Sequence, residues 1–311
     1  MTKIIIFLLI FIVYLNCKND IPCSPIDTSC NVTGYLLSEL ISRNRKQVTS
    51  GANTNSGTTN TTNTTSLSKN PNEISNLGFW FLADDLGLAD GTNVTSWTDK
   101  SGNGNNLSIT TGTLNPIYKV NIIGGKSVIR FQGGSNKALT LASSTINLNT
   151  NTNLTLFVIV KFSDFSTLRR IVTFGNAGNG ISYDGLQNPN NYFAIRLEAV
   201  NWFAHSPNLL NASTDYLLTS TMTRNSVAGI YFNNTYINTN LIANSSSFAG
   251  AAPQNNNQIS IGGYFDGTQN LGGDVAEVIQ YTRVLTTDEI LSIHCYLNSR
   301  YQINPSLVCR K

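Results

Sequence analysis

The feature that most constrains this fold is a succession of short apolar, β-branched and aromatic runs from about residue 76 onward. Clusters of Gly, Asn, Asp and Pro separate the runs, as turns separate strands. No crossover helix is readable between consecutive runs, which excludes a parallel α/β sheet. The pattern predicts an all-β fold, an antiparallel β-sandwich. The predicted strands are residues 79–82, 127–131, 154–162, 169–175, 192–197, 216–224, 227–233, 258–264 and 275–281.

One amphipathic helix follows the last run. Thr286 and Glu289 have the spacing of a capping box, in which each side chain accepts a hydrogen bond from the backbone of the other residue. Apolar residues then recur on one helical face. These residues are Ile290, Ile293, Leu297 and Tyr301. The sequence therefore predicts one C-terminal α-helix on the β domain.

The N-terminus carries an export signal. Lys3 precedes an apolar stretch, residues 4–15, that is too short to span a bilayer as a helix, and Cys17 follows it. The arrangement resembles a bacterial lipoprotein signal of the relaxed, spirochaetal type, although Tyr14 and Asn16 depart from the usual lipobox. The resemblance implies a signal peptide over residues 1–16 and a lipid on Cys17 that anchors the exported protein in the outer membrane or at the cell surface. A retained apolar anchor and plain secretion are the alternatives.

The remaining cysteines form an even set. An even number of cysteines in an exported chain predicts disulfides, because the compartment is oxidising. The simplest of the three connectivities joins Cys23 to Cys30 and Cys295 to Cys309. Zinc binding is disfavoured because no C-x-x-C motif or flanking His pair accompanies these cysteines.

Composition divides the chain into four segments. After the signal, residues 17–48 hold the first cysteine pair and a candidate short helix, and residues 49–75 are rich in Thr, Asn and Ser. Residues 49–75 can bury too little apolar surface to fold and are predicted to be a disordered linker. Residues 76–311 form the folded domain. The net charge of +3 gives no electrostatic footprint for nucleic acid.

Two stretches of this domain resemble the LamG-like, concanavalin A-type jelly roll domains of bacterial surface proteins. The opening half contains VTSWTDKSGNGNNL, NPIYKV and GGKSVIRFQGG, and the closing half is GGDVAEVIQYTRVLTTDEILSIHCYLNSRY. They resemble, in order, the W-x-D-x-S-G-N-G entry, the P-x-Y and V-x-F-x-G strands, and the final strand, turn and helix of that family. The resemblance covers roughly residues 77–303. It implies two packed antiparallel sheets, with ligand sites on loops or on a concave sheet face.

The WTDKSGNGNN segment has two interpretations. As a structural turn, its polar side chains satisfy backbone amides while Trp97 anchors it to the core. As a Ca²⁺ site, Asp99, Ser101 and Asn103 match the first half of an EF-hand loop, but Thr110 stands where a bidentate Glu belongs. The structural turn is favoured, and Ca²⁺ is the one cofactor that the sequence suggests.

Two other stretches contain candidate ligand-binding residues, because aromatic, amide and carboxylate side chains suit sugar or peptide recognition. The candidates are Trp202, His205, Tyr264, Asp266 and Asn270. Strand alternation would send Trp202 and Phe203 to opposite faces, so one of the two is expected in the core, and the favoured alternative is that both pack within the sandwich. For the stretch around Tyr264, an ordinary hairpin turn is the alternative.

Catalytic patterns are missing from the sequence. None of the five glutamates begins the E-x-D-x-x-E strand of jelly roll glycoside hydrolases, and no G-x-S-x-G, H-E-x-x-H or Walker motif occurs. Glu277 lies in an apolar strand and needs a buried partner, for which Arg130 and Arg283 are candidates. We therefore expect a non-catalytic binding or adhesion module for a glycan or a host or matrix protein. The alternatives are a structural envelope protein that binds another protein and a glycan-processing enzyme with an unrecognised acidic pair.

Overall fold

A computed structural model describes most of the C-terminal part of the chain. The described residues are 68–109, 114–134, 138–146, 153–175, 181–185, 191–197, 202–225, 229–248, 257–266 and 268–309. They belong to one of two compact units, Thr64–Lys311. The predicted signal peptide, Cys17, the Cys23–Cys30 pair and most of the predicted linker lie outside these residues. None of the helices among the described residues has the length and hydropathy of a membrane span.

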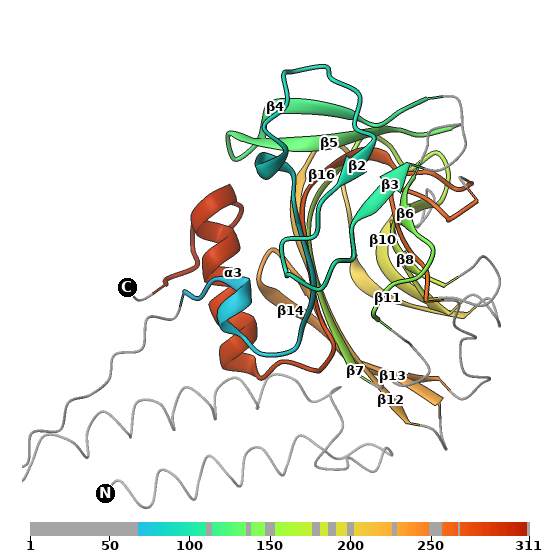
Figure 1. The fold of residues 1–311 in the computed structure, drawn as a ribbon. Helices are drawn as coiled ribbons and strands as arrows, with labels where there is room; N and C mark the ends of the chain where they lie inside the picture. The colour runs from blue at the N-terminus through green and yellow to red at the C-terminus, as the bar shows by residue number, and fades with distance from the viewer. Residues whose placement is uncertain are drawn as a thin grey trace, which may run out of the picture. The chain divides into compact units, whose positions relative to one another are not determined.

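Two antiparallel sheets pack face to face in this unit (Figure 1). Sheet A has the order β14-β13-β12-β7-β16-β5-β4, and β1 also pairs with β16. Sheet B has the order β11-β10-β9-β8-β15-β6-β3-β2. The strands of sheet A are β1 (Leu77–Leu82), β4 (Ile117–Ile123), β5 (Lys126–Gln132), β7 (Asn153–Phe162), β12 (Asp215–Asn225), β13 (Gly229–Ile237), β14 (Asn240–Phe248) and β16 (Gly272–Tyr281). Those of sheet B are β2 (Ser96–Trp97), β3 (Leu107–Ile109), β6 (Leu139–Leu141), β8 (Arg169–Phe174), β9 (Ile181–Gly185), β10 (Tyr192–Leu197), β11 (Trp202–Leu209) and β15 (Ile259–Ile261). The predicted all-β antiparallel sandwich is confirmed.

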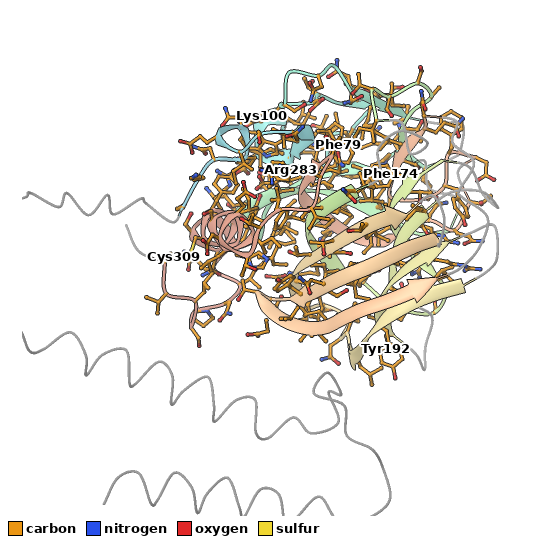
Figure 2. All side chains as sticks on the ribbon, turned by 90° about the horizontal axis from the view of Figure 1, so that it is seen from below. Phe79, Lys100, Phe174, Tyr192, Arg283 and Cys309 are labelled. Carbon is orange, nitrogen blue, oxygen red and sulfur yellow. A yellow bond between two sulfur atoms is a disulfide. The ribbon has the colours of Figure 1, made fainter. Side chains whose placement is uncertain are left out.

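Alternation along the strands builds the core between the sheets. Val158 and Val160 face inward from β7, and Phe174 and Tyr183 face inward from β8 and β9. The rings of Phe79 and Phe174 lie 6.0 Å apart and join the two sheets (Figure 2). Such interdigitation is what holds two sheets about 10 Å apart in a sandwich.

Helix α3 (Thr287–Tyr301) covers the outer face of sheet A (Figure 1). Its apolar side packs on a second core cluster that includes Trp80, Phe157, Ile159, Ile279, Ile290, Ile293, Leu297 and Tyr301. Sheet A is therefore buried on both faces at its centre, and every residue of β16 is buried. A strand buried on both faces reads as a continuous apolar run. This explains why the central strands of sheet A stand out in the sequence.

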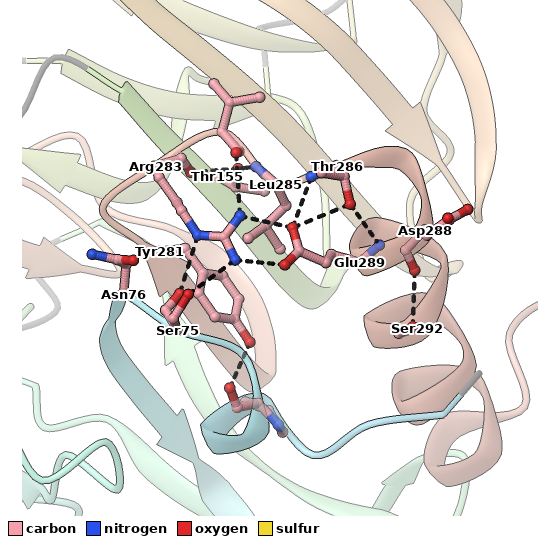
Figure 3. A network of polar contacts seen from close by, with 12 residues as sticks. Ser75, Asn76, Thr155, Tyr281, Arg283, Leu285, Thr286, Asp288, Glu289 and Ser292 are labelled. Carbon is pink, nitrogen blue, oxygen red and sulfur yellow. Dashed lines mark hydrogen bonds and ion pairs between the residues drawn. The ribbon is translucent and has the colours of Figure 1, made fainter. Parts of the chain in front are cut away.

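The start of α3 has the predicted capping box (Figure 3). The Glu289 amide donates to the Thr286 hydroxyl oxygen at 3.3 Å, and the Thr286 amide donates to the Glu289 carboxylate at 2.9 Å. Arg283 adds a bidentate ion pair with Glu289, at 2.7 and 2.6 Å. The same guanidinium donates to the Ser75 carbonyl at 3.2 Å, so the helix start is tied to the entry of the chain.

That entry is part of the folded unit. A 3₁₀ turn, η2 (Pro71–Glu73), precedes β1, and the Tyr281 hydroxyl donates to the Pro71 carbonyl at 2.8 Å. Residues 71–75, which were predicted to belong to the linker, thus pack on the β domain through main-chain hydrogen bonds and a buried Pro71. The polar composition of the predicted linker did not reveal that these residues contact Tyr281.

The Cys295–Cys309 disulfide is present, as predicted, with the Cα atoms 5.6 Å apart. Cys295 is buried in α3, and the bond fastens the tail that follows the helix (Figure 2). Loop closure by a disulfide stabilises mainly by restricting the unfolded chain.

Replacing Cys309 by serine is expected to lower the free energy of unfolding by about 2 kcal/mol, the low end of the usual range, because only a terminal tail is released. Urea unfolding of the oxidised protein and of Cys309→Ser measures the difference. A matched Ser306→Ala change in the same tail should leave stability unaltered. Equal stability of Cys309→Ser and the native protein would contradict this account.

Candidate functional site

The outer face of sheet B, directed away from sheet A, is polar. One register row crosses the sheet and contains Ser96, Ser108, Thr140, Ser260, Thr173, Ser182 and Arg196. Directly opposed residues of antiparallel strands lie on the same face, so these side chains are directed to the same side of sheet B, which we call the polar face. Ser96 and Ser108 are exposed and Arg196 is half-buried, whereas Thr140, Ser260, Thr173 and Ser182 in the middle of the row are buried. The polar face differs in kind from the outer face of sheet A, whose centre is apolar and lies under α3.

A buried ion pair lies in the adjacent row of the polar face. Arg170 on β8 is directly opposite Asp184 on β9, and both side chains are fully buried. The Arg170 guanidinium donates to the Asp184 carboxylate and to the Ser182 hydroxyl, and Ser182 donates to Asp184 at 2.9 Å. A buried charge pair is tolerated only when further hydrogen bonds satisfy its remaining donors and acceptors.

The loop after β15 supplies those further bonds. The Gln269 side-chain oxygen accepts from Arg170 Nε at 3.0 Å and from Nη2 at 2.7 Å. The Tyr264 hydroxyl accepts from the same Nη2, and the guanidinium carbon lies 4.4 Å from the Tyr264 ring centroid. Arg170 is therefore held by a carboxylate, an amide, hydroxyls and an aromatic ring at once.

The loop is shaped by glycine. Gly262 has a φ of +83°, and a Cβ there would lie 2.1 Å from the Phe131 ring. Only glycine fits such a position. At the loop's tip, Asp266 accepts from the Thr268 amide at 2.9 Å. These contacts set Tyr264 over Arg170.

Three of the five predicted ligand-binding residues meet in this loop. Tyr264 is buried in contact with Arg170 rather than open as a platform, Asp266 is exposed at the tip, and Asn270 is buried. Asn270 Nδ2 donates to the Gly134 carbonyl at 2.6 Å, which anchors the loop's end. Tyr264 and Asn270 thus support the polar face, and Asp266 lies at its rim.

The other two predicted residues, Trp202 and His205, lie on β11 at the edge of the same sheet. His205 is opposite Ala194, in the row of Asp184. Trp202 is opposite Leu197, in the row that continues through Ile181 of the core. Their side chains are outside the described part of the structure.

The WTDKSGNGNN turn is fastened to β1. Asp99 Oδ1 accepts from the amides of Trp80 and Ser101, at 3.0 and 2.9 Å. Asp99 Oδ2 accepts from the Ser101 hydroxyl and the Asn105 amide, at 2.8 and 3.0 Å. Asn103 Nδ2 donates to the Leu77 carbonyl at 2.7 Å.

Trp97 is buried in the core beside this turn, as expected. The candidate Ca²⁺ ligands Asp99, Ser101 and Asn103 therefore direct their polar atoms to one another and to backbone groups of the turn and of β1. Across the described residues, no group of three or more His, Cys, Asp or Glu side chains is arranged to hold a metal ion.

Glu277 has other partners than the two arginines suggested by the sequence. Its carboxylate accepts from Trp80 Nε1 at 2.7 Å, from the Tyr296 hydroxyl at 3.0 Å and from the Tyr301 hydroxyl at 2.9 Å, and Arg300 Nε lies 3.6 Å away. These groups come from β1 and α3, so Glu277 fastens the helix to sheet A.

The two suggested arginines are engaged elsewhere. Arg130 pairs with Asp274 and Arg283 with Glu289. The prediction of either as the Glu277 partner was wrong, because cross-strand register places Arg130 beside Asp274, and the strand-to-helix turn carries Arg283 to the first turn of α3.

Burial raises the pKa of Glu277 to about 7, while hydrogen bonds from Trp80 and Tyr301 oppose the rise. A raised carboxyl pKa is also a property of catalytic acids. Glycoside hydrolysis, however, requires two carboxyl groups on either side of the scissile bond. The groups around Glu277 are two tyrosines, a tryptophan and an arginine, a set suited to docking a helix.

Comparisons with known proteins identify the fold only. No family model matches the chain. No curated protein matches its sequence. Domain 4 of a GH43 extracellular arabinanase from Geobacillus stearothermophilus, determined in complex with arabinotriose, is similar with a TM-score of 0.50 and 13% identity, over 70% of this chain and 97% of that domain.

Two other solved structures are similar over part of their length. A GH54 α-L-arabinofuranosidase has a TM-score of 0.50 and 11% identity, over 67% of this chain and 51% of the enzyme. The receptor-binding domain of botulinum neurotoxin type G has a TM-score of 0.48 and 14% identity, over 74% of this chain and 51% of that domain. This chain spans about half the length of each of these two. The neighbours are β-sandwich domains of jelly-roll-like form, in agreement with the resemblance read from the sequence.

Proposed function

We propose that this protein is an exported, lipid-anchored surface protein whose β-sandwich binds glycans without catalysis. The observation that carries the proposal is the polar face, where Ser96, Ser108 and Arg196 are accessible at the two ends of a row whose central hydroxyl groups are buried beside the Arg170–Asp184 pair. The arabinanase domain with this fold was determined with a trisaccharide bound, which supports the ligand class.

The chemistry of the polar face suits saccharides. A sugar hydroxyl donates one hydrogen bond and accepts others, so it pairs well with surfaces that offer both kinds of group. Around the face, Arg196 offers donors, Asp266 offers acceptors, and Gln269 at the loop offers an amide. Glu277, the carboxyl group with a raised pKa, lies under α3 on the other sheet. This separation favours binding over hydrolysis.

Binding is tested on an array of neutral and acidic glycans that includes arabinotriose, with the full chain as the probe. Arg196→Ala is expected to reduce binding at least tenfold, because Arg196 is a half-buried cation in the hydroxyl row of the polar face. The matched control is Lys119→Ala on β4 of sheet A, which removes another half-buried cation and should leave binding unchanged. Binding that survives Arg196→Ala, or no binding to any glycan, would refute the polar face as the site.

The proposal of a lipid anchor is based on the apolar leader and on Cys17. Labelled palmitate is expected to enter the native protein and not Cys17→Ala. Incorporation into both, or into neither while a control lipoprotein is labelled, would remove the lipid anchor from the proposal and leave the binding module untouched.

A further inference from the structure

A row of alternating charge crosses the outer face of sheet A beyond the apolar cluster under α3. Arg130 on β5 is opposite Asp274 on β16, Asp274 is opposite Lys161 on β7, and Lys161 is opposite Asp215 on β12. Lys161 follows Ile159, a member of the apolar cluster, by two residues. Residues two apart on a strand share a face, so the charged row continues the helix-covered face into an uncovered region.

Each cation in the row has an acidic partner. Arg130 Nε and Nη2 donate to the two Asp274 oxygens at 2.7 and 2.9 Å, and Lys161 Nζ lies 2.7 Å from Asp215 Oδ1. The Arg130 side chain is 41% exposed, whereas Asp274 is 5% exposed. The acid thus holds the guanidinium in place while part of the guanidinium faces solvent.

A pocket of about 400 Å³ opens over this row. Its volume is within the usual range of small-molecule sites, about 300–1,000 Å³. The lining residues are Arg130, Phe131, Gln132, Lys161, Phe162, Ser163, Ser213, Gly273 and Asp274. The accessible lining is more apolar than polar, and its hydrogen-bonding groups come from Arg130, Gln132, Lys161, Ser163, Ser213 and Asp274.

Gly273, which lines the pocket, and Gly272 before it have no room for a side chain. A Cβ on Gly273 would lie 2.3 Å from the Lys161 carbonyl oxygen, and one on Gly272 would lie 2.8 Å from the Ser163 hydroxyl. A side chain at Gly273 would collide with the backbone of the neighbouring strand. The close approach of the two backbones therefore requires glycine and leaves the space above it open.

We infer that this pocket is a second saccharide site, separate from the polar face, and that it takes a neutral sugar. Both cations of the lining are neutralised by an ion pair, Arg130 by Asp274 in the lining and Lys161 by Asp215 just outside it, so neither cation is left without an acidic partner to attract an anion. Donors from Arg130 and Lys161 alternate with carboxylate acceptors, which matches hydroxyl groups that both donate and accept. The ligand is held by hydrogen bonds, since the rings in the lining are buried.

The site is independent of the polar face and lies on the opposite sheet. With both sites occupied, one molecule would bridge two chains of a glycan. Linked binding of this kind raises the overall avidity without strengthening either contact.

Calorimetric titration of the full chain with arabinotriose, maltotriose and trigalacturonate tests the inference. We expect a neutral trisaccharide to bind, and Ser163→Trp to weaken that binding at least tenfold by filling the pocket from its exposed rim. Arg130→Gln should act in the same direction. Thermal unfolding checks that each variant is folded. If Arg130→Gln unfolds because Asp274 is left unpaired, the inference is tested by Ser163→Trp without it. Lys119→Ala is the control.

Each other result overturns the inference. Binding of a neutral trisaccharide that Ser163→Trp leaves unchanged places the site elsewhere, and loss of that binding in Arg196→Ala instead supports the polar face alone. Binding of trigalacturonate alone refutes the neutral class. If none of the three sugars binds, the pocket is not a saccharide site. The polar face is then still tested independently by the glycan-array experiment.

Discussion

Arg170→Met is expected to lower the free energy of unfolding by about 3–5 kcal/mol, the cost of breaking a buried ion pair from one side. The Asp184 carboxylate, fully buried opposite Arg170, would lose its charged partner. Tyr264 and Gln269 would lose the guanidinium that joins the loop to β8. Urea unfolding followed by tryptophan fluorescence measures the loss.

Two further variants serve as comparisons for the stability of Arg170→Met. The double change Arg170→Met with Asp184→Leu is expected to recover much of the stability, because apolar replacements of a whole buried pair are often neutral. Lys119→Met breaks the solvent-screened pair with Asp90 and should cost much less than Arg170→Met. A loss for Arg170→Met as small as the loss for Lys119→Met would mean that the buried pair contributes little to the fold.

The pH dependence of stability is expected to depend on two buried groups of opposite effect. Burial lowers the pKa of His294 to about 4 and raises that of Glu277 to about 7. Between pH 4.5 and 6.5 the unfolded chain binds a proton at His294 that the folded protein does not, so His294 makes stability fall as the pH falls. The folded protein holds a proton at Glu277 that the unfolded chain releases, so Glu277 makes stability fall as the pH rises. The two effects offset each other in the native protein.

Removing either group should therefore reveal the other. In Glu277→Gln, stability is expected to rise with pH by about 1.4 kcal/mol per unit from pH 4.5 to 6.5, about 3 kcal/mol in all. In His294→Gln it is expected to fall with pH by a similar amount. Urea unfolding at pH 4.5, 5.5 and 6.5 gives both slopes. Below this window Glu289, whose pKa Arg283 lowers to about 2, should destabilise all three proteins as the pH falls. Parallel pH profiles for the three proteins would contradict this account.

How much of the fold the sequence reveals depends on where each strand is buried. The central strands β7 and β16 are buried on both faces and were predicted to within three residues. In sheet B, β9 is also buried at every residue, but it reads ISYDG and looks like a turn, because the residues directed away from sheet A are Ser182 and Asp184. The polar β14 was missed for a related reason. A strand with polar residues on one side lacks the continuous apolar run that identifies a buried strand in the sequence.

The candidate site was predictable only in part. The loop with Tyr264 was flagged by its aromatic and amide residues, but Arg170 was visible only as one of two adjacent arginines. Asp184 and Gln269 reach Arg170 through cross-strand register and loop placement, over separations of 14 and 99 residues. Local patterns carry no information about such pairings. The charged row on sheet A escaped prediction for the same reason.

The position of the chain entry determines which side of the sandwich is covered. The residues before β1 are tied to Tyr281 and Arg283 on the side where α3 covers sheet A (Figure 1). The entry segment and the helix therefore shield the same side of the sandwich, and a partner that approaches from that side contacts α3 and η2 before it reaches the central strands of sheet A.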